Sequence, residues 1–107
     1  MPSNEEPGLE ALVSSLIETG RSAAFLEDQL GTLLALPGRP RGTLLATLEA
    51  LLDSQFNIAA TGRRLGVRRQ SVYYRLEQLK GMLGDLDSPD RQAGLLVALE
   101  LLKRNSV

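Results

Sequence analysis

The chain contains no cysteine, no histidine and no tryptophan among its 107 residues. Without cysteine, neither a disulfide framework nor a thiolate metal site is possible. The lack of histidine removes most zinc sites as well as the commonest general base. No apolar run reaches the roughly 20 residues of a membrane-spanning helix, and the N-terminus lacks a signal-peptide pattern. We therefore expect a cytoplasmic protein with no metal, no cofactor and no membrane partner.

Catalytic motifs are also lacking. Pairs of serine or cysteine with histidine are impossible, and no paired carboxylates share a helix face within residues 57–83. The segment 62–66 (GRRLG) has two glycines, but not the spacing of a phosphate-binding Walker loop. Asp85, Asp87 and Asp90 lack the glycine and the closing glutamate of an EF-hand, which favours their interpretation as part of a helix start. We expect a protein that is not an enzyme.

The composition is typical of an all-α protein. Leucine dominates the 43% of apolar residues, and aromatic residues make up 4%. We predict five to six helices, with an N-terminal tail and amphipathic helix in residues 1–20 and the main domain in residues 21–107. The tail (1–8, MPSNEEPG) is polar, and we expect disorder at its start. The helix, residues 9–19, has an apolar stripe and stops at Gly20; the stripe consists of Leu9, Leu12, Val13, Leu16 and Ile17.

Further helices are predicted from residues that cap a helix or break it. Ser22 is expected to cap a helix at 23–30 that faces inward with Phe25, Leu26 and Leu30, and Gly31-Thr32 is expected to break it. The segment 37–42 (PGRPRG) is predicted to be a solvated loop, although its two arginines are within reach of a phosphate. A helix at 43–52 is expected to bury Leu44, Leu48, Leu51 and Leu52, and Phe56 is expected in the core. Ser88 is expected to cap a last helix at 89–103.

The central stretch, Asn57 to Leu83, has the pattern of a helix-turn-helix. A short helix at 58–65, capped by Asn57, is expected to face inward with Ile58, Ala59 and Leu65. Gly66-Val67 supplies the turn, and a longer helix is predicted at 69–82. The second helix carries an apolar stripe at helical spacing, namely Val72, Leu76, Leu79 and Leu83. Such a motif places its second helix in the DNA major groove.

Charge is concentrated in the same stretch. From Asn57 to Lys80 there are six basic residues and one acidic residue, a net charge of +5 in a chain whose net charge is −1. A local basic patch is what phosphate contact requires, because salt screens more distant charges. We expect phosphate contacts from Arg63, Arg64, Arg68, Ser71, Arg75 and Lys80. Pairing of Arg75 with Glu49 or Asp53 would compete with this role.

Base contacts are expected from the exposed face near the start of the second helix, opposite the apolar stripe or to one side of it. These residues are Arg69, Gln70, Tyr73 and Tyr74. Arginine bridges guanine O6 and N7, and glutamine bridges adenine N6 and N7. The alternative interpretation is that the arginines form an ordinary solvated surface and that the tyrosines are half-buried packing residues. The residues alone leave both open.

These residues also resemble the C-terminal helix-turn-helix of PucR-type transcriptional regulators, and more distantly the Fis/NtrC-type DNA-binding helices. The matching positions are Asn57, Thr61, Leu65, Val67, Arg69, Tyr74, Arg75 and Leu76. Segments 30–34, 43–52 and 85–89 resemble the flanking segments of that family, so the similarity extends from Phe25 to Lys103. The resemblance implies a DNA-binding domain of a bacterial regulator. It also implies that any effector acts through an upstream domain absent from this chain.

Four positions depart from the family pattern. Gly62 replaces a small alanine, Arg68 replaces histidine, and Gln70 and Ser71 replace asparagine and threonine. Gly62 is expected to loosen its helix by roughly 1 kcal/mol. Arg68 leaves the second helix without the usual side-chain cap, so we expect a DNA phosphate to meet its free amide groups. The recognised base sequence does not carry over from the family.

Three functions remain as hypotheses. The first is a DNA-binding domain that binds double-stranded DNA as a homodimer. Dimerisation is expected through the 9–19 helix or the 89–103 helix, because the latter is apolar on nearly every side. The second is a helical protein-interaction or dimerisation module that has lost DNA binding. The third is a small-molecule sensor, for which the sequence supplies no convergent polar groups.

Overall fold

The computed structural model describes residues 7–105, which form six α-helices and no strand. The helices are α1 (Pro7–Glu18), α2 (Ser22–Leu34), α3 (Gly38–Asp53), α4 (Ile58–Leu65), α5 (Arg69–Leu83) and α6 (Pro89–Asn105). The predicted all-α class is therefore confirmed. Most of the expected N-terminal tail lies outside the described residues. Within them, no helix is both long and apolar enough to cross a membrane.

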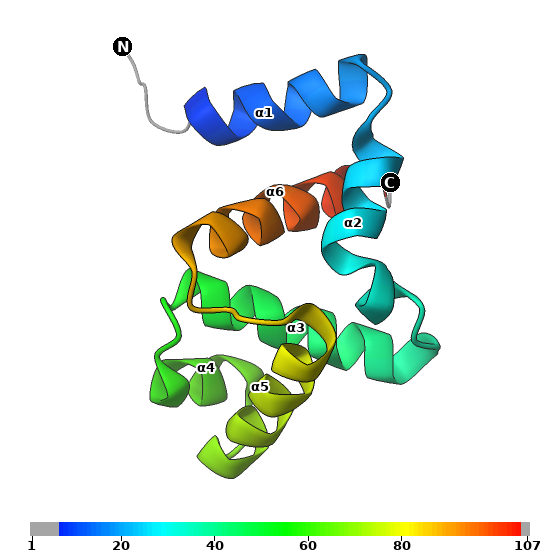
Figure 1. Ribbon diagram of the computed structural model, residues 1–107. Helices are drawn as coiled ribbons and strands as arrows, with labels where there is room; N and C mark the ends of the chain where they lie inside the picture. The colour runs from blue at the N-terminus through cyan, green and yellow to red at the C-terminus, as the bar shows by residue number, and fades with distance from the viewer. Residues whose placement is uncertain (1–6, 106–107) are drawn as a thin grey trace.

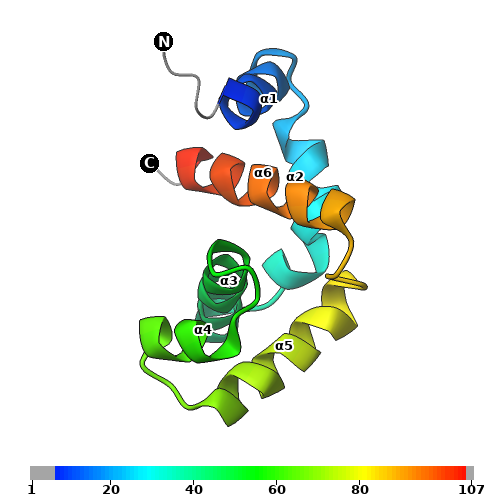
Figure 2. The same ribbon diagram turned by 90° about the vertical axis from the view of Figure 1, so that its left-hand side faces the viewer.

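The helices are arranged as two halves (Figure 1). We call α3, α4 and α5, residues 38–83, the lower half, and α1, α2 and α6 the upper half. Helix α2 packs against both α5 and α3, and α6 packs against α3, so the halves share one apolar core. Figure 2 shows the same division from the side, with α1 beyond α6 at one end and the α4–α5 pair at the other. Residues buried with no exposed surface include Leu30, Leu33, Leu48, Leu51, Leu79, Leu86, Leu95 and Leu101.

Helix α1 ends as the sequence predicts. Gly20 has a positive φ of 72°, and the N–H of Arg21 donates to the carbonyl of Leu16 at 2.9 Å, which closes the last turn. The apolar stripe is only partly buried: Val13 is fully covered, whereas Leu12 is 56% exposed and Ile17 is 43% exposed. Helix α1 packs against α2 and α6 through the middle of its stripe and leaves Leu12 and Ile17, at the two margins of the stripe, exposed.

Two expectations for α2 are wrong. Ser22 is its first helical residue rather than its cap, and the residue at the cap position, Arg21, makes no capping side-chain bond. Gly31 and Thr32 do not break the helix, which continues to Leu34. A single helical glycine costs about 1 kcal/mol, and burial of Leu30 and Leu33 on either side outweighs that cost. Phe25, expected to face inward, is half-buried against the core.

The predicted loop at 37–42 is also wrong from Gly38 onward. These residues form the first turn of α3, which begins at Gly38. The first four N–H groups of a helix have no partner within the helix, so Pro40 removes no hydrogen bond there. The predicted burial of Leu44, Leu48, Leu51 and Leu52 further along α3 is confirmed.

Helix α6 begins as predicted, because the hydroxyl of Ser88 accepts a hydrogen bond from the N–H of Arg91 at 3.3 Å. Its apolar surface is covered on several sides by α1, α2 and α3. Leu96 is 40% exposed, whereas Leu95, Ala98 and Leu101 have no exposed surface. The chain itself therefore supplies the cover for which the sequence suggested a partner subunit, and this argument for dimerisation through α6 fails.

One arginine of α6 joins the two halves. The Arg91 guanidinium donates from Nε (3.2 Å) and Nη2 (2.9 Å) to the carbonyl of Leu83 at the end of α5. Its Nη1 donates to Oε1 of Gln29 in α2 at 2.8 Å. Carbonyls in the last turn of a helix have no partner within the helix, so this side chain supplies one. The C-terminal end of α5 is thus fixed to the upper half.

Candidate nucleic-acid interface

Helices α4 and α5 form the helix-turn-helix that the sequence predicts. The side chain of Asn57 caps α4, because its Oδ1 accepts from the N–H of Ala60 at 2.9 Å. Gly66 ends α4 in the left-handed region with a φ of 71°, which glycine adopts without strain. Helix α5 then begins at Arg69, as predicted, and ends at Leu83, one residue later than predicted.

The inner face of α5 is confirmed, whereas that of α4 needs correction. Val72, Leu76, Leu79 and Leu83 are all buried. In α4 the buried residues are Thr61 and Gly62, while the expected inner residues Ile58, Ala59 and Leu65 are only half-buried. Helix α4 therefore packs against the rest of the domain through the small residues in its middle, rather than through its larger apolar side chains.

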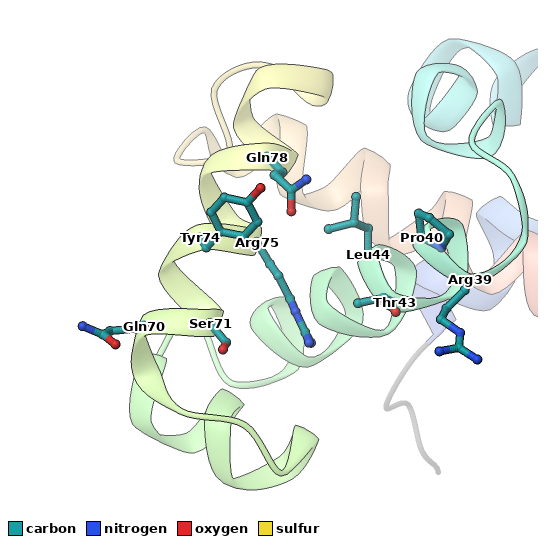
Figure 3. A pocket seen from close by; sticks show the side chains of 9 residues that line it. All are labelled: Arg39, Pro40, Thr43, Leu44, Gln70, Ser71, Tyr74, Arg75 and Gln78. Carbon is teal, nitrogen blue, oxygen red and sulfur yellow. The ribbon is translucent and has the colours of Figure 1, made fainter.

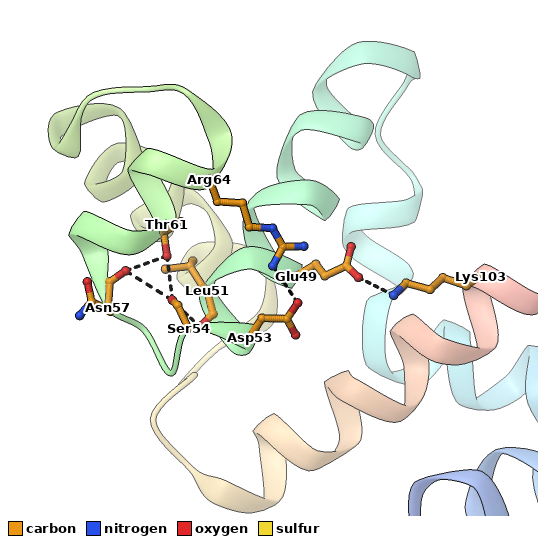
Figure 4. A network of polar contacts seen from close by, with 8 residues as sticks. All are labelled: Glu49, Leu51, Asp53, Ser54, Asn57, Thr61, Arg64 and Lys103. Carbon is orange, nitrogen blue, oxygen red and sulfur yellow. Dashed lines mark hydrogen bonds and ion pairs between the residues drawn. The ribbon is translucent and has the colours of Figure 1, made fainter. Parts of the chain in front are cut away.

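A buried hydroxyl fixes α4 to the end of α3 (Figure 4). The Thr61 side chain has no exposed surface, and its Oγ1 donates to the carbonyl of Asn57 at 2.8 Å. The same oxygen lies 3.0 Å from Oγ of Ser54, the residue that follows α3. Buried hydroxyls are costly unless they are bonded, so this pair specifies how the two helices meet. The sequence pattern included Thr61 but gave it no physical role.

Gly62 has a packing role that propensity alone does not reveal. A Cβ at this position would lie 2.8 Å from the carbonyl oxygen of Val67, a backbone atom of the turn. The N–H of Val67 donates to the carbonyl of Gly62 at 3.0 Å. Glycine therefore allows the turn to fold closely onto α4, which offsets its lower helix propensity.

The connection from α3 to α4 uses two left-handed residues that are not glycine. Gln55 has a φ of 56° and Phe56 a φ of 63°. The N–H of Phe56 donates to the carbonyl of Leu51 at 2.7 Å, which terminates α3. Such a conformation costs roughly 1–2 kcal/mol for a residue with a Cβ. Phe56 is half-buried and packs against the core from outside, so the expectation that it lies in the core is only partly met.

The four predicted base-contact residues share the exposed surface at the start of α5. Arg69 and Gln70 are exposed, Tyr73 is 55% exposed and Tyr74 is 67% exposed. The alternative in which the two tyrosines are half-buried packing residues is therefore wrong. No hydrogen bond to another described residue involves any of these four side chains.

The predicted phosphate-contact residues differ in how they are held. Arg63, Arg68 and Lys80 are exposed, and Ser71 is half-buried. The Arg64 guanidinium lies 2.8 Å from Oδ2 of Asp53, and this hydrogen bond raises the pKa of Arg64. Lys80 lies 3.9 Å from the carboxylate of Glu77.

Arg75 does not have the acidic partner that the sequence suggested. It is half-buried, and its Nη1 donates to Oγ1 of Thr47 in α3 at 3.4 Å. Its two expected partners are engaged elsewhere, because Asp53 pairs with Arg64 and Glu49 pairs with Lys103. Among the described residues, Arg75 therefore has no acidic partner.

Two hollows border α5. The first, of about 530 Å³, lies between the starts of α3 and α5 (Figure 3); it is lined by Arg39, Pro40, Thr43, Leu44, Gln70, Ser71, Tyr74, Arg75 and Gln78. The second, of about 580 Å³, lies at the turn; it is lined by Ala59, Gly62, Arg63, Gly66, Val67, Arg68 and Arg69. Among the described residues that line the two hollows there are arginines but no aspartate or glutamate. Both hollows therefore attract anions.

The charge of the lower half is opposite to that of the rest. Residues 38–83 hold eight basic and three acidic residues, a net charge of +5. Because the whole chain has a net charge of −1, the remaining residues carry −6. The half of the molecule with the net positive charge is therefore the half that contains α5.

Comparison with known families agrees with this geometry. The model of the PucR C-terminal helix-turn-helix domain matches residues 44–101, more than half of the chain. The matched range begins in α3, contains all of α4 and α5, and ends within α6. No curated protein and no solved structure matches the chain significantly.

Proposed function

The chain belongs to the family of PucR C-terminal helix-turn-helix domains, DNA-binding domains of transcription regulators, and we propose that it reads duplex DNA with α5 in the major groove. The observation that carries this proposal is the position of the four exposed side chains at the start of α5. All four are exposed; Gln70 and Tyr74 line the hollow beside α3, and Arg69 lines the hollow at the turn. Base contacts in helix-turn-helix proteins come from this end of the second helix.

Each of the four side chains has a chemistry suited to base edges. Arg69 presents two parallel donors to guanine O6 and N7, and Gln70 presents a donor and an acceptor to adenine. Tyr73 and Tyr74 offer a ring edge for a thymine methyl group and a hydroxyl for a phosphate. Their exposure leaves them free to make these contacts.

Phosphate contacts surround this reading face. Arg63 and Arg68 line the hollow at the turn, and Ser71 and Arg75 line the hollow beside α3. Arg64 must exchange Asp53 for a phosphate, a low cost because both side chains are about half exposed. Lys80 lies further along α5, where it reaches the backbone rather than the bases. The first amides of α5 have no side-chain cap, and a phosphate there would accept hydrogen bonds from them.

We also propose that the domain acts as a homodimer on DNA. Two recognition helices about 34 Å apart would meet successive major grooves on one face of the duplex. The supporting observation is that two large apolar side chains of α1, Leu12 and Ile17, are exposed. A strictly monomeric species by light scattering at high protein concentration would refute dimerisation of this chain.

Selection from a randomised duplex library tests the proposed function. The purified chain should enrich a sequence motif over successive rounds, because the four residues read base edges. A folded chain that enriches no motif and retains no DNA at low salt would contradict the proposal. That result would favour the alternative of a helical protein-interaction module.

A further inference from the structure

The hollow between the starts of α3 and α5 has a basic side chain on each of its two walls. Arg39 extends from the first turn of α3, and Arg75 reaches from α5 toward α3 (Figure 3). We infer that this hollow holds the second of the two DNA strands that flank α5, and that Arg39 is a phosphate ligand on it. The inference rests on the proposed function, since it presupposes that α5 lies in a major groove.

The dimensions of a helix in DNA explain why two strands must be accommodated. A helix with its side chains is about 10–12 Å wide, and the major groove is about 12 Å wide. Phosphates of both strands therefore lie beside an inserted helix. The two hollows share no lining residue, and they border α5 on different sides. The hollow at the turn, with Arg63 and Arg68, would bind phosphates of one strand. The hollow beside α3 would bind phosphates of the other strand.

The structure separates two arginines that the sequence could not tell apart. Nη1 of Arg41 donates to the carbonyl of Leu34 at 3.4 Å, so this side chain satisfies the end of α2. Arg39 is exposed and has no hydrogen bond or ion pair with any described residue. It lies on a helix rather than in a loop, so its backbone has a fixed position relative to α5.

The opposite wall of the hollow carries the positive charge of Arg75. Arg75 is held there by the neutral Oγ1 of Thr47, and the half-buried Ser71 adds a hydroxyl donor one turn earlier on α5. Tyr74 borders the same hollow. A phosphate between the walls would accept hydrogen bonds from Arg39 and Ser71 while it faces the charge of Arg75.

Salt dependence provides the first test, with Arg39→Ala and Arg41→Ala as matched variants. Binding to a labelled randomised duplex is measured by fluorescence anisotropy over a series of salt concentrations. Loss of one phosphate contact should reduce the slope of log K against log salt by about 0.9, so the affinity deficit of Arg39→Ala shrinks by about 3.5-fold when salt rises fourfold. Arg41→Ala should keep the wild-type slope and lower only the thermal stability.

The outcomes separate the inference from the proposed function. Absence of salt-dependent binding by the folded wild-type chain contradicts both. Wild-type binding together with an unchanged slope for Arg39→Ala overturns the inference alone. Both variants should retain the wild-type circular dichroism spectrum at the measuring temperature, because both side chains are exposed.

Cross-linking tests the position of Arg39 by a route that does not depend on its charge. The chain has no cysteine, so Arg39→Cys provides a single attachment point for a thiol-linked photoreactive group. That group should cross-link to the labelled duplex. Arg21→Cys, which places the group just before α2 in the upper half, should not. Equal yields from the two positions, or no yield from position 39, would overturn the inference.

Discussion

The two halves of the molecule use their cations differently. Of the four basic residues outside 38–83, Arg91 bonds backbone and amide oxygens, and Arg104 and Lys103 pair with Glu10 and Glu49; the exposed side chain of Arg21 bonds no described residue. The lower half has eight basic residues, and four have no hydrogen bond or ion pair with any described residue; these are Arg39, Arg63, Arg68 and Arg69. All four line the hollows beside α5. Cations of the upper half mainly stabilise the fold, whereas those of the lower half are available to a ligand.

Among the substitutions that test this comparison, Arg91→Ala is expected to have the largest effect. Arg91→Ala removes charged hydrogen bonds to Leu83 and Gln29 and leaves their oxygens without this partner. We expect the free energy of unfolding to fall by roughly 2–3 kcal/mol, measured by urea denaturation. The control Arg63→Ala in the lower half should change it by less than about 0.5 kcal/mol. Equal stability losses would refute the division of roles.

A comparable effect on binding is expected from Arg69. Arg69→Ala should weaken binding to a selected DNA site by about 1–3 kcal/mol and relax the preference at one base pair. Lys80→Ala is the control, because a phosphate contact should weaken binding to all sequences alike and reduce the salt slope by about 1. Anisotropy titrations with selected and scrambled duplexes measure both. If Arg69→Ala weakened both duplexes equally, a base contact at this residue would be ruled out.

A smaller effect is expected within the lower half, at the contact between α3 and α4. Thr61→Val keeps the shape of the side chain but removes the hydroxyl that bonds Asn57 and Ser54. The free energy of unfolding should fall by about 1–2 kcal/mol. Thr32→Val, at an exposed position of α2, is the matched control and should change it by less than about 0.5 kcal/mol. Thermal and urea melts of both variants measure how much the buried hydroxyl contributes to the free energy of unfolding.

The smallest expected effect is a gain in stability at the end of α3. Gln55→Gly relieves a left-handed residue, although glycine also increases the entropy of the unfolded chain. A net stabilisation of about 0.5–1 kcal/mol should result. Ala46→Gly, at an exposed helical position of the same helix, should instead destabilise by about 1 kcal/mol. Opposite signs in the two melts are the expected outcome, and a loss in both would show that the turn is unstrained.

The sequence predicts the parts of this fold that depend on local pattern. The bounds of α4 and the start of α5 follow from Asn57, Gly66 and the spacing of four buried apolar residues. The composition of 37–42 indicated a loop, because a count of proline and glycine ignores where in a helix proline is tolerated. Pro40 in a first turn is compatible with helix.

Contacts between distant residues are what the sequence could not provide. Arg91 and Gln29 are 62 positions apart, and nothing in the local pattern pairs them. The cover of α6 by three helices, and the choice of Arg64 rather than Arg75 as the partner of Asp53, also depend on the packed fold. The base and phosphate contacts stay predictions, now with defined positions around α5.

The most direct test of the central claim is the salt dependence of DNA binding by the chain itself. Fluorescence anisotropy with a randomised duplex at two salt concentrations measures it. The account predicts clear binding at low salt and a steep loss at higher salt, because the arginines around α5 displace counterions from phosphates. A chain that shows the circular dichroism of a folded helical domain and yet does not bind at low salt would contradict it.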